Sequence, residues 1–206
     1  MDIPKWLEWG QKLLALARAG LAYTENKFDV ERYHEITNIA AEMVATYSEV
    51  DTTVIKSLYD MQVGYQTPKV DARGVVFKDD KILLVKELSD GFWTLPGGWM
   101  DVNETPGQAV AREVHEEAGY IVQAVKLMAI YDRRLHGHPA YLFHVYKLFF
   151  MCNLLGGEAT TSIETGGAEF FGLDNLPPLS LTRTTLEEIE RCFVHHQQPN
   201  LPTEFD

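Results

Sequence analysis

Hydrophobic residues in the first sixty positions recur every three or four residues, which is the spacing of one face of an α-helix. The pattern predicts a helix over residues 6–21 and a second helix over residues 29–47, with Asp29 as the cap of the second. Apolar residues at the same spacing predict a short third helix over residues 54–61. The amino-terminal part of the chain is therefore expected to be helical.

Beyond these helices the pattern changes to short apolar runs that are typical of β-strands. Residues 70–77 and 81–86 flank two consecutive aspartates and predict a hairpin. Further elements are expected as strands over 121–131, 141–152 and 169–173 and a closing helix over 186–195. Segment 64–69 holds a glycine and a proline and is interpreted as a linker. The expected organisation is a helical domain over 1–63 and an α+β domain over 70–206.

Composition is that of an ordinary soluble globular protein, with 46% hydrophobic and 23% charged residues among 206. No apolar run has the length of a membrane span, and the first residues lack the apolar stretch of a secretory signal, so a cytoplasmic location is expected. Cys152 and Cys192 lie in apolar surroundings without the spacing of metal ligands. They are expected to be buried free thiols.

The formal net charge of −12 argues against DNA, RNA and anionic membranes as partners. Residues 1–60 carry six basic against ten acidic residues and show no basic stripe, so the predicted helices do not look like a DNA-binding head. Trp6 and Trp9 could anchor a partner subunit or pack against the second helix. The pattern leaves both possibilities open.

Three glutamates in the middle of the chain carry the most specific chemistry. Glu113, Glu116 and Glu117 are spaced i, i+3 and i+4, so a helix places their carboxylates on one face. Like charges this close repel, and a divalent cation with a preference for oxygen ligands, Mg²⁺ or Mn²⁺, would compensate them. A solvated acidic helix face is the alternative explanation for the three glutamates alone.

The residues around these glutamates predict where their helix begins and ends. Thr105 and Gln108 have the spacing of a capping box, with a proline at the first helical position, and Gly119 suits a left-handed C-cap. Arg112 is placed to orient a carboxylate one turn along the helix or to pair with Glu104 on the preceding loop. The helix is therefore expected to begin just after Thr105.

The run 98–120 resembles the signature of the Nudix hydrolases, G-x5-E-x7-R-E-U-x-E-E-x-G-U, where U is a bulky apolar residue. The matching residues are Gly98, Glu104, Arg112, Glu113, Val114, Glu116, Glu117, Gly119 and Tyr120. Only Tyr120 is a soft match, at the final apolar position. The resemblance implies a Nudix α/β/α sandwich with a mixed sheet, and the amino-terminal helices resemble the corresponding module of a Nudix subgroup that forms homodimers.

The same resemblance implies roles for the residues of the motif. Divalent ions, one to three Mg²⁺ or Mn²⁺, are expected on Glu113, Glu116, Glu117 and the backbone carbonyl of Gly97. Glu116 is also expected to be catalytic. Arg112 and Glu104 are expected to support catalysis, Glu104 through water or Arg112 and not as a direct ligand.

A further glutamate is expected to act as the general base. Nudix pyrophosphatases commonly carry a catalytic or metal-linked glutamate on a loop after the main motif, and Glu164 lies on a polar loop just before a predicted strand. Glu158 is the second choice for this role. A solvated loop acid is the alternative explanation of Glu164.

The polar segment 131–139 is a candidate for substrate binding. Its arginines and histidines could hold a phosphate or another group of the substrate, and the candidates are Tyr131, Arg133 and His136. A polar hairpin turn is the alternative. A zinc site at His136 and His138 is not favoured, because no further ligand lies nearby in the sequence.

The reaction implied by the resemblance is metal-dependent hydrolysis of a nucleoside diphosphate linked to a small moiety X, giving a nucleoside monophosphate and X-phosphate. CDP-choline is the favoured substrate and ADP-ribose the alternative. A nucleotide-sensing module without turnover is the rival of another class, but such a module is expected to lose its metal-binding glutamates, and all three are present. Pyrophosphate removal from RNA 5′ ends would need a basic groove, which the net charge does not favour.

Overall fold

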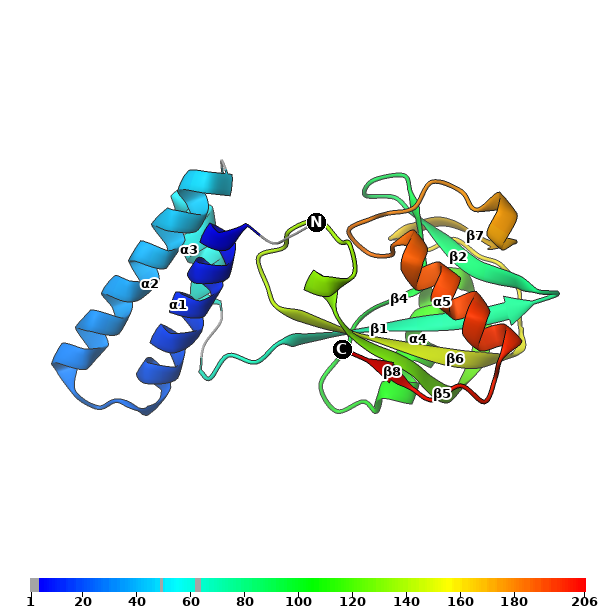
Figure 1. Ribbon diagram of the computed structural model, residues 1–206, viewed down its shortest axis with the longest axis horizontal. Coiled ribbons are helices and arrows are strands. Elements are labelled where there is room, and N and C mark those ends of the chain that lie inside the picture. Colours follow the sequence, from blue (N-terminus) through cyan, green and yellow to red (C-terminus); the bar gives the residue numbers. More distant parts are fainter. Residues whose placement is uncertain (1–3, 49, 62–63) are drawn as a thin grey trace. The chain divides into compact units, whose positions relative to one another are not determined.

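The computed structural model describes residues 4–48, 50–61 and 64–206, which divide into two compact units (Figure 1). One unit holds residues 69–139 and 145–206, and the other holds the described residues up to 68 together with 140–144. No helix within this described part is long and apolar enough to cross a membrane. The predicted domain boundary at residue 63 lies outside the described residues, and the assignment of domains to 1–63 and 70–206 stays a prediction.

The helical unit contains the three helices that the apolar spacing predicts. They are α1 (Lys5–Tyr23), α2 (Lys27–Ser48) and α3 (Thr52–Asp60). Helix α2 begins two residues before Asp29, because the Asn26 side chain accepts a hydrogen bond from Phe28 N at 2.9 Å. The prediction that Asp29 caps this helix was therefore wrong, since Asp29 lies in the first turn.

The core of the helical unit also takes in a segment from much later in the chain. Leu142 packs against this core, and Gln11 Nε2 donates to the carbonyls of Tyr141 and Leu142 at 2.9 and 3.0 Å. Because these carbonyls bond to Gln11, the strand predicted over 141–152 begins only at Val145. Several hydrophobic side chains of this unit remain exposed, namely Trp9, Leu16, Tyr23, Phe28, Ile39 and Tyr47, whereas Trp6 packs against the core.

The second unit is built on a mixed eight-stranded sheet. Its strands are β1 (Lys69–Lys78), β2 (Lys81–Glu87), β3 (Trp93–Thr94), β4 (Gly97–Trp99), β5 (Tyr120–Asp132), β6 (Val145–Gly157), β7 (Thr165–Phe171) and β8 (Glu204–Phe205). The order along the sheet is β3-β2-β1-β6-β5-β8, with β4 beside β1 and β7 beside β2. The pairs β1–β6 and β5–β8 are parallel and the others antiparallel. The predicted hairpin is confirmed, and Asp79 and Asp80 turn with positive φ of 50° and 55°.

Two helices cover opposite faces of this sheet (Figure 1). Helix α4 (Pro106–Ala118) packs Val110 and Val114 on one face, and α5 (Leu186–Gln197) packs Ile189 on the other. A short 3₁₀ turn, η1 (Arg133–Leu135), lies between β5 and β6, and another, η2 (Leu173–Asn175), lies between β7 and α5. The fold is thus the expected α+β architecture, with an α/β/α sandwich after three helices. Both cysteines are buried and free, as predicted.

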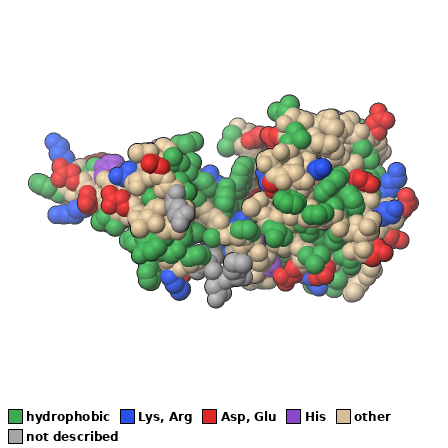
Figure 2. Space-filling model, turned by 90° about the horizontal axis from the view of Figure 1, so that it is seen from above, with side chains coloured by type: hydrophobic (Ala, Val, Ile, Leu, Met, Phe, Trp, Pro, Cys, Tyr) green, Lys and Arg blue, Asp and Glu red, His purple; other side chains and the backbone are tan. Residues whose placement is uncertain are grey.

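Surface charge is mixed on the face shown in Figure 2, where acidic and basic side chains are interspersed among hydrophobic ones. The net charge of −12 is therefore not gathered there into one acidic patch.

Candidate active site

The turn between β3 and β4 brings the backbone against the end of α4. Gly97 has a φ of +138°, and a Cβ added there would lie 2.1 Å from the carbonyl oxygen of Ala72, so only glycine fits. Gly97 N donates to Glu117 Oε2 at 2.8 Å. The turn therefore fixes the position of one motif carboxylate through a backbone hydrogen bond.

Helix α4 begins and ends where the sequence predicts. Thr105 and Gln108 form the capping box, with Gln108 Oε1 accepting from Thr105 N at 2.8 Å. Gly119 is the left-handed C-cap with a φ of 77°. Because both ends are fixed, the carboxylates on the helix face toward the Gly97 turn are held in register with that turn.

The three glutamates of α4 differ in their surroundings. The side chain of Glu116 is 57% exposed and that of Glu113 is 14% exposed, while Glu117 is buried. Burial raises the pKa of Glu117 to about 7, against the lowering effects of the Arg73 guanidinium and the Gly97 N–H. Burial also raises the pKa of Glu113, although the hydrogen bond from Arg112 opposes it. The fold thus holds two carboxylates where their negative charge is disfavoured.

Arg112 connects the carboxylates of the motif. Its guanidinium binds Glu104 through two hydrogen bonds, from Nη2 at 2.9 Å and from Nε at 3.1 Å. Nη1 donates to Glu113 Oε1 at 2.9 Å and to Glu116 Oε2 at 3.1 Å. The hydrogen bond to Glu104 is the largest cause of a raised pKa of Arg112. The sequence left open whether Arg112 pairs with Glu104 or orients a helix carboxylate, and the structure shows both.

The chemistry of this cluster fits a divalent cation, although the carboxylates do not converge on one point. Within residues 4–48, 50–61 and 64–206, no three His, Cys, Asp or Glu side chains form a ready metal site. The donors near the turn are nonetheless oxygens, and the Gly98 backbone approaches Glu113 closely, since a Cβ there would lie 3.4 Å from both of its carboxylate oxygens. Oxygen ligands suit Mg²⁺ or Mn²⁺, and Arg112 would give up part of its pairing when such an ion binds.

The predicted general base lies beside the end of α4. The carbonyl of Glu164 accepts from Leu88 N at 2.9 Å, and the next residue, Thr165, donates its hydroxyl to the carbonyl of Glu117 at 2.6 Å. The Glu164 carboxylate is exposed. Burial is the main cause of a raised pKa of Glu87, and the negative charge of Glu164 adds a smaller contribution. The backbone of Glu158 approaches Gly119 at the helix end. The backbone at each candidate base therefore lies beside the carboxyl-terminal end of helix α4.

The three predicted substrate-binding residues lie elsewhere on the same unit. Tyr131 stacks on His136 with ring centroids 3.9 Å apart and donates its hydroxyl to Glu204 at 2.5 Å. Nε2 of His136 lies 2.8 Å from Asp206 Oδ1. Tyr131 and His136 line a pocket of about 490 Å³ with residues of α5 and 203–206, and no residue of the 98–120 motif lines it. Their role in substrate binding stays a prediction.

Arg133 has a different position from the one its sequence context suggests. Its side chain is buried, and the guanidinium donates to Pro139 O at 2.8 Å and to Thr182 O at 3.1 Å. These contacts join two loops of the unit. They favour a structural role, and substrate binding by Arg133 stays a prediction that none of these contacts supports.

Three charged residues near the motif were missed by the sequence interpretation. Arg73 on β1 is buried, pairs with Asp71 at 2.9 Å, and its charge acts on both Glu117 and Glu87. Glu87 at the end of β2 pairs with Arg183 Nε at 3.0 Å. The signal for Arg73 was present, since two residues of opposite charge, Asp71 and Arg73, interrupt the apolar run of β1. Arg183 gave no such signal, because it lies in a polar loop.

Comparison with known proteins finds a matching family for each of two parts of the chain. Residues 68–196 match the NUDIX domain family, and residues 4–59 match a family described as UDP-X-like, N-terminal oligomerisation domain. A Bacillus subtilis protein named "Putative ADP-ribose pyrophosphatase YjhB" is 43% identical over 202 residues, covering 98% of this chain and 97% of that protein. An ADP-ribose pyrophosphatase of Methanocaldococcus jannaschii is 38% identical over 122 residues, covering 56% of this chain and 69% of that one.

Solved structures agree in fold. The crystal structure of an ADP-ribose pyrophosphatase from Streptococcus suis matches with a TM-score of 0.63 and 44% identity, covering 68% of this chain and all of that one. The crystal structure of a UDP-X diphosphatase matches over the whole of both chains, with a TM-score of 0.64 and 29% identity. Three of these four relatives carry names with ADP-ribose, the fourth names UDP-X, and none of the four names CDP-choline. With the motif helix, the glycine turn and the matched domain in agreement, the chain belongs to the Nudix hydrolases and is a pyrophosphohydrolase of that family.

Proposed function

We propose that this protein hydrolyses ADP-ribose to AMP and ribose 5-phosphate, using Mg²⁺ or Mn²⁺. The observation that carries the proposal is the set of motif carboxylates held by Arg112 and by the Gly97 turn. The choice of ADP-ribose is supported by relatives of that name that are 38–44% identical. CDP-choline, which the sequence interpretation favoured, becomes the alternative substrate.

We infer that Glu113, Glu116, Glu117 and the carbonyl of Gly97 hold the divalent ions. When bound, these ions neutralise charge on the diphosphate and make water a better nucleophile. Arg112 keeps Glu113 and Glu116 oriented, and is itself held by its two hydrogen bonds to Glu104. These residues therefore set where the diphosphate lies relative to the attacking water.

Glu164 is proposed as the base that takes a proton from this water. The water oxygen then forms a bond to one phosphorus, and the bridging P–O bond to the other phosphate breaks. The exposed carboxylate of Glu164 is reachable by water, and the hydrogen bond between Thr165 and the carbonyl of Glu117 keeps its loop beside α4. The amino-terminal helices, with their exposed hydrophobic side chains, are proposed to form a homodimer.

The test is incubation of the protein with Mg²⁺ and a panel of ADP-ribose, CDP-choline and UDP-sugars, with products identified by chromatography. AMP and ribose 5-phosphate at the highest kcat/KM support the proposal, and preferred turnover of CDP-choline rejects it in favour of the alternative. A Glu164→Gln variant is expected to lose about 10²- to 10⁴-fold in kcat with KM little changed. Near-normal turnover by that variant would remove Glu164 from the role of base.

A further inference from the structure

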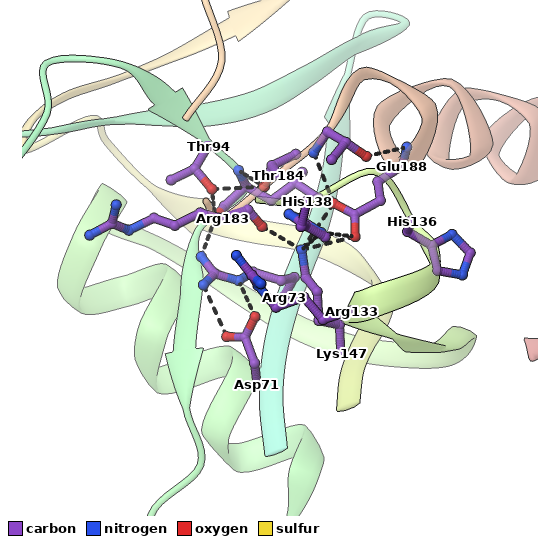
Figure 3. Close-up of polar contacts among 12 residues, drawn as sticks. Asp71, Arg73, Thr94, Arg133, His136, His138, Lys147, Arg183, Thr184 and Glu188 are labelled. Atoms are coloured by element: carbon purple, nitrogen blue, oxygen red, sulfur yellow. Dashed lines mark hydrogen bonds and ion pairs between the residues drawn. The ribbon is translucent and has the colours of Figure 1, made fainter. Parts of the chain in front are cut away.

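Three buried side chains donate hydrogen bonds to the successive backbone carbonyls of residues 181–183, in the loop before α5 (Figure 3). His138 Nδ1 donates to the carbonyl of Leu181 at 2.7 Å. Arg133 Nη2 donates to the carbonyl of Thr182 at 3.1 Å, and Lys147 Nζ donates to the carbonyl of Arg183. All three donors come from 133–147, far from the loop in sequence. Three consecutive carbonyls bound in this way leave the backbone of the loop little freedom.

A buried carboxylate fixes two of these donors. Glu188 Oε1 lies 2.9 Å from His138 Nε2, and Glu188 also accepts from Lys147 Nζ at 2.9 Å. Its Oε2 further accepts from Thr185 N at 2.9 Å, at the start of α5. The side chains of Glu188 and Lys147 are at most 1% exposed. Because separating buried charges is costly, this cluster is a rigid support for the loop.

The side chain of Arg183 leaves this support and reaches the β2–β3 turn. Nε lies 3.0 Å from Glu87 Oε1, Nη1 lies 3.4 Å from Asp90 Oδ2, and Nη2 donates to Ser89 Oγ at 3.2 Å. In Figure 3 it extends away from Lys147 and Glu188. About a third of the side chain is exposed, so its guanidinium is both oriented and accessible.

Contacts on both sides place Arg183 next to the active site. The following residue, Thr184, accepts a hydrogen bond from Leu95 N at 3.2 Å, and two residues after Leu95 the turn binds Glu117 through Gly97 N. On the other side, Leu88 N, the residue after Glu87, donates to the carbonyl of Glu164. Arg183 thus lies between the glycine turn and the loop of the proposed base.

An incoming diphosphate needs such a cation. Arg73 is buried, and the Arg112 guanidinium pairs with the carboxylates proposed to hold the ions. Arg183 pairs instead with Glu87 and Asp90, which are not among those carboxylates. Resting on the proposed function, we propose that Arg183 binds a phosphate oxygen of the diphosphate substrate, giving up part of its pairing with Asp90. Lys147, His138 and Arg133 are then positioning residues that hold the backbone of Arg183.

The first test compares Arg183→Gln with Arg32→Gln. Arg32 is the control, because its guanidinium pairs with the Asp29 carboxylate on helix α2, which holds none of the residues proposed for catalysis or substrate binding. With the best substrate of the wild type, Arg183→Gln should raise KM about 10- to 100-fold, with kcat changed less than about 3-fold, whereas the control keeps both values. An unchanged KM for Arg183→Gln overturns the proposal.

The second test separates positioning from direct binding. Arg133→Lys shortens the reach to Thr182 and should raise KM about 3- to 10-fold in the wild type but not in an Arg183→Gln background. If Arg133 contacts the substrate itself, its effect persists in the double variant, and the positioning role is rejected. If Arg133→Lys changes KM in neither background, the positioning role is also rejected.

Calorimetry measures the Kd of inorganic pyrophosphate in the presence of Mg²⁺. It tests the phosphate contact of Arg183 separately from the proposed hydrolysis of ADP-ribose. If the wild type turns over no conjugate, the proposed function fails. A pyrophosphate Kd raised at least 10-fold by Arg183→Gln, and not by Arg32→Gln, still supports the phosphate contact. Equal dissociation constants overturn the contact alone, and a wild type that neither turns over a conjugate nor binds pyrophosphate overturns both.

Discussion

Replacement of Glu188 by glutamine tests whether the buried cluster is held by charge. Burial alone would raise the pKa of Glu188, but the Lys147 ammonium and the His138 ring lower it from 4.5 to about 2. At about 1.4 kcal/mol for each pKa unit, the ionised carboxylate contributes about 3 kcal/mol to the free energy of unfolding at neutral pH. Loss of one partner from a buried ion pair generally costs about 3–5 kcal/mol, which agrees with this figure.

The sign of the pH dependence follows from the lowered pKa. A carboxylate with a lower pKa in the folded state stabilises the fold above the unfolded pKa of 4.5, and this stabilisation is lost as the pH falls toward 2. The difference in free energy of unfolding between wild type and Glu188→Gln should therefore be about 3 kcal/mol at pH 7 and about 1 kcal/mol at pH 3.

Urea denaturation followed by tryptophan fluorescence measures this difference at the two pH values. Asp80→Asn is the control, since it alters a surface contact with His196 Nε2 in which the Asp80 side chain is 94% exposed, and it should cost less than about 1 kcal/mol at pH 7. A Glu188→Gln difference that is equal at pH 7 and pH 3, or no larger than that of the control, would refute the reasoning.

Two further substitutions probe the motif. Gly97→Ala should lower kcat by about 10²-fold or more, because the added Cβ would lie 2.1 Å from the Ala72 carbonyl and displace the turn. Gly64→Ala, at a φ of +88° with open space around it and outside the motif, should keep normal turnover, and equal kcat for the two variants contradicts the role of the turn. Arg112→Gln should raise the Mg²⁺ concentration for half-maximal activity about 10- to 100-fold, and Arg112→Lys should not restore it, since lysine cannot bind Glu104 bidentately. A magnesium titration of activity checks this, and an unchanged midpoint would exclude Arg112 as the residue that orients the carboxylates.

The parts of the fold that were predictable from sequence depend on local contacts. The capping box of α4 joins residues three positions apart, and the hairpin turn at Asp79 joins neighbouring residues. The pairing of Arg112 with Glu104 spans only eight positions. Patterns of this kind are visible in a single sequence because both partners lie within one or two turns of each other.

The parts that were not predictable depend on contacts between distant residues. Thr184 meets Thr94 across 90 positions, and Arg133 meets Thr182 across 49. The sequence does not distinguish a buried arginine from a solvated one. The loop 131–139 therefore suggested phosphate binding, although the Arg133 side chain is buried and binds backbone carbonyls. Arg183 was overlooked for the opposite reason, because only the folded loop directs it toward Glu87.

The balance of charge around α4 links metal and substrate binding. Glu104, Glu113, Glu116 and Glu117 are four acidic side chains, whereas Arg112, which pairs with three of them, and Arg73, which acts on Glu117, are two basic ones, so acidic groups are in excess before a diphosphate arrives. A diphosphate would add further negative charge, so its binding without added cations is opposed by repulsion. Divalent ions and substrate must therefore each raise the affinity for the other by the same factor, since such coupling is reciprocal. When no ion is bound, the buried position of the Glu117 carboxylate raises its pKa to about 7.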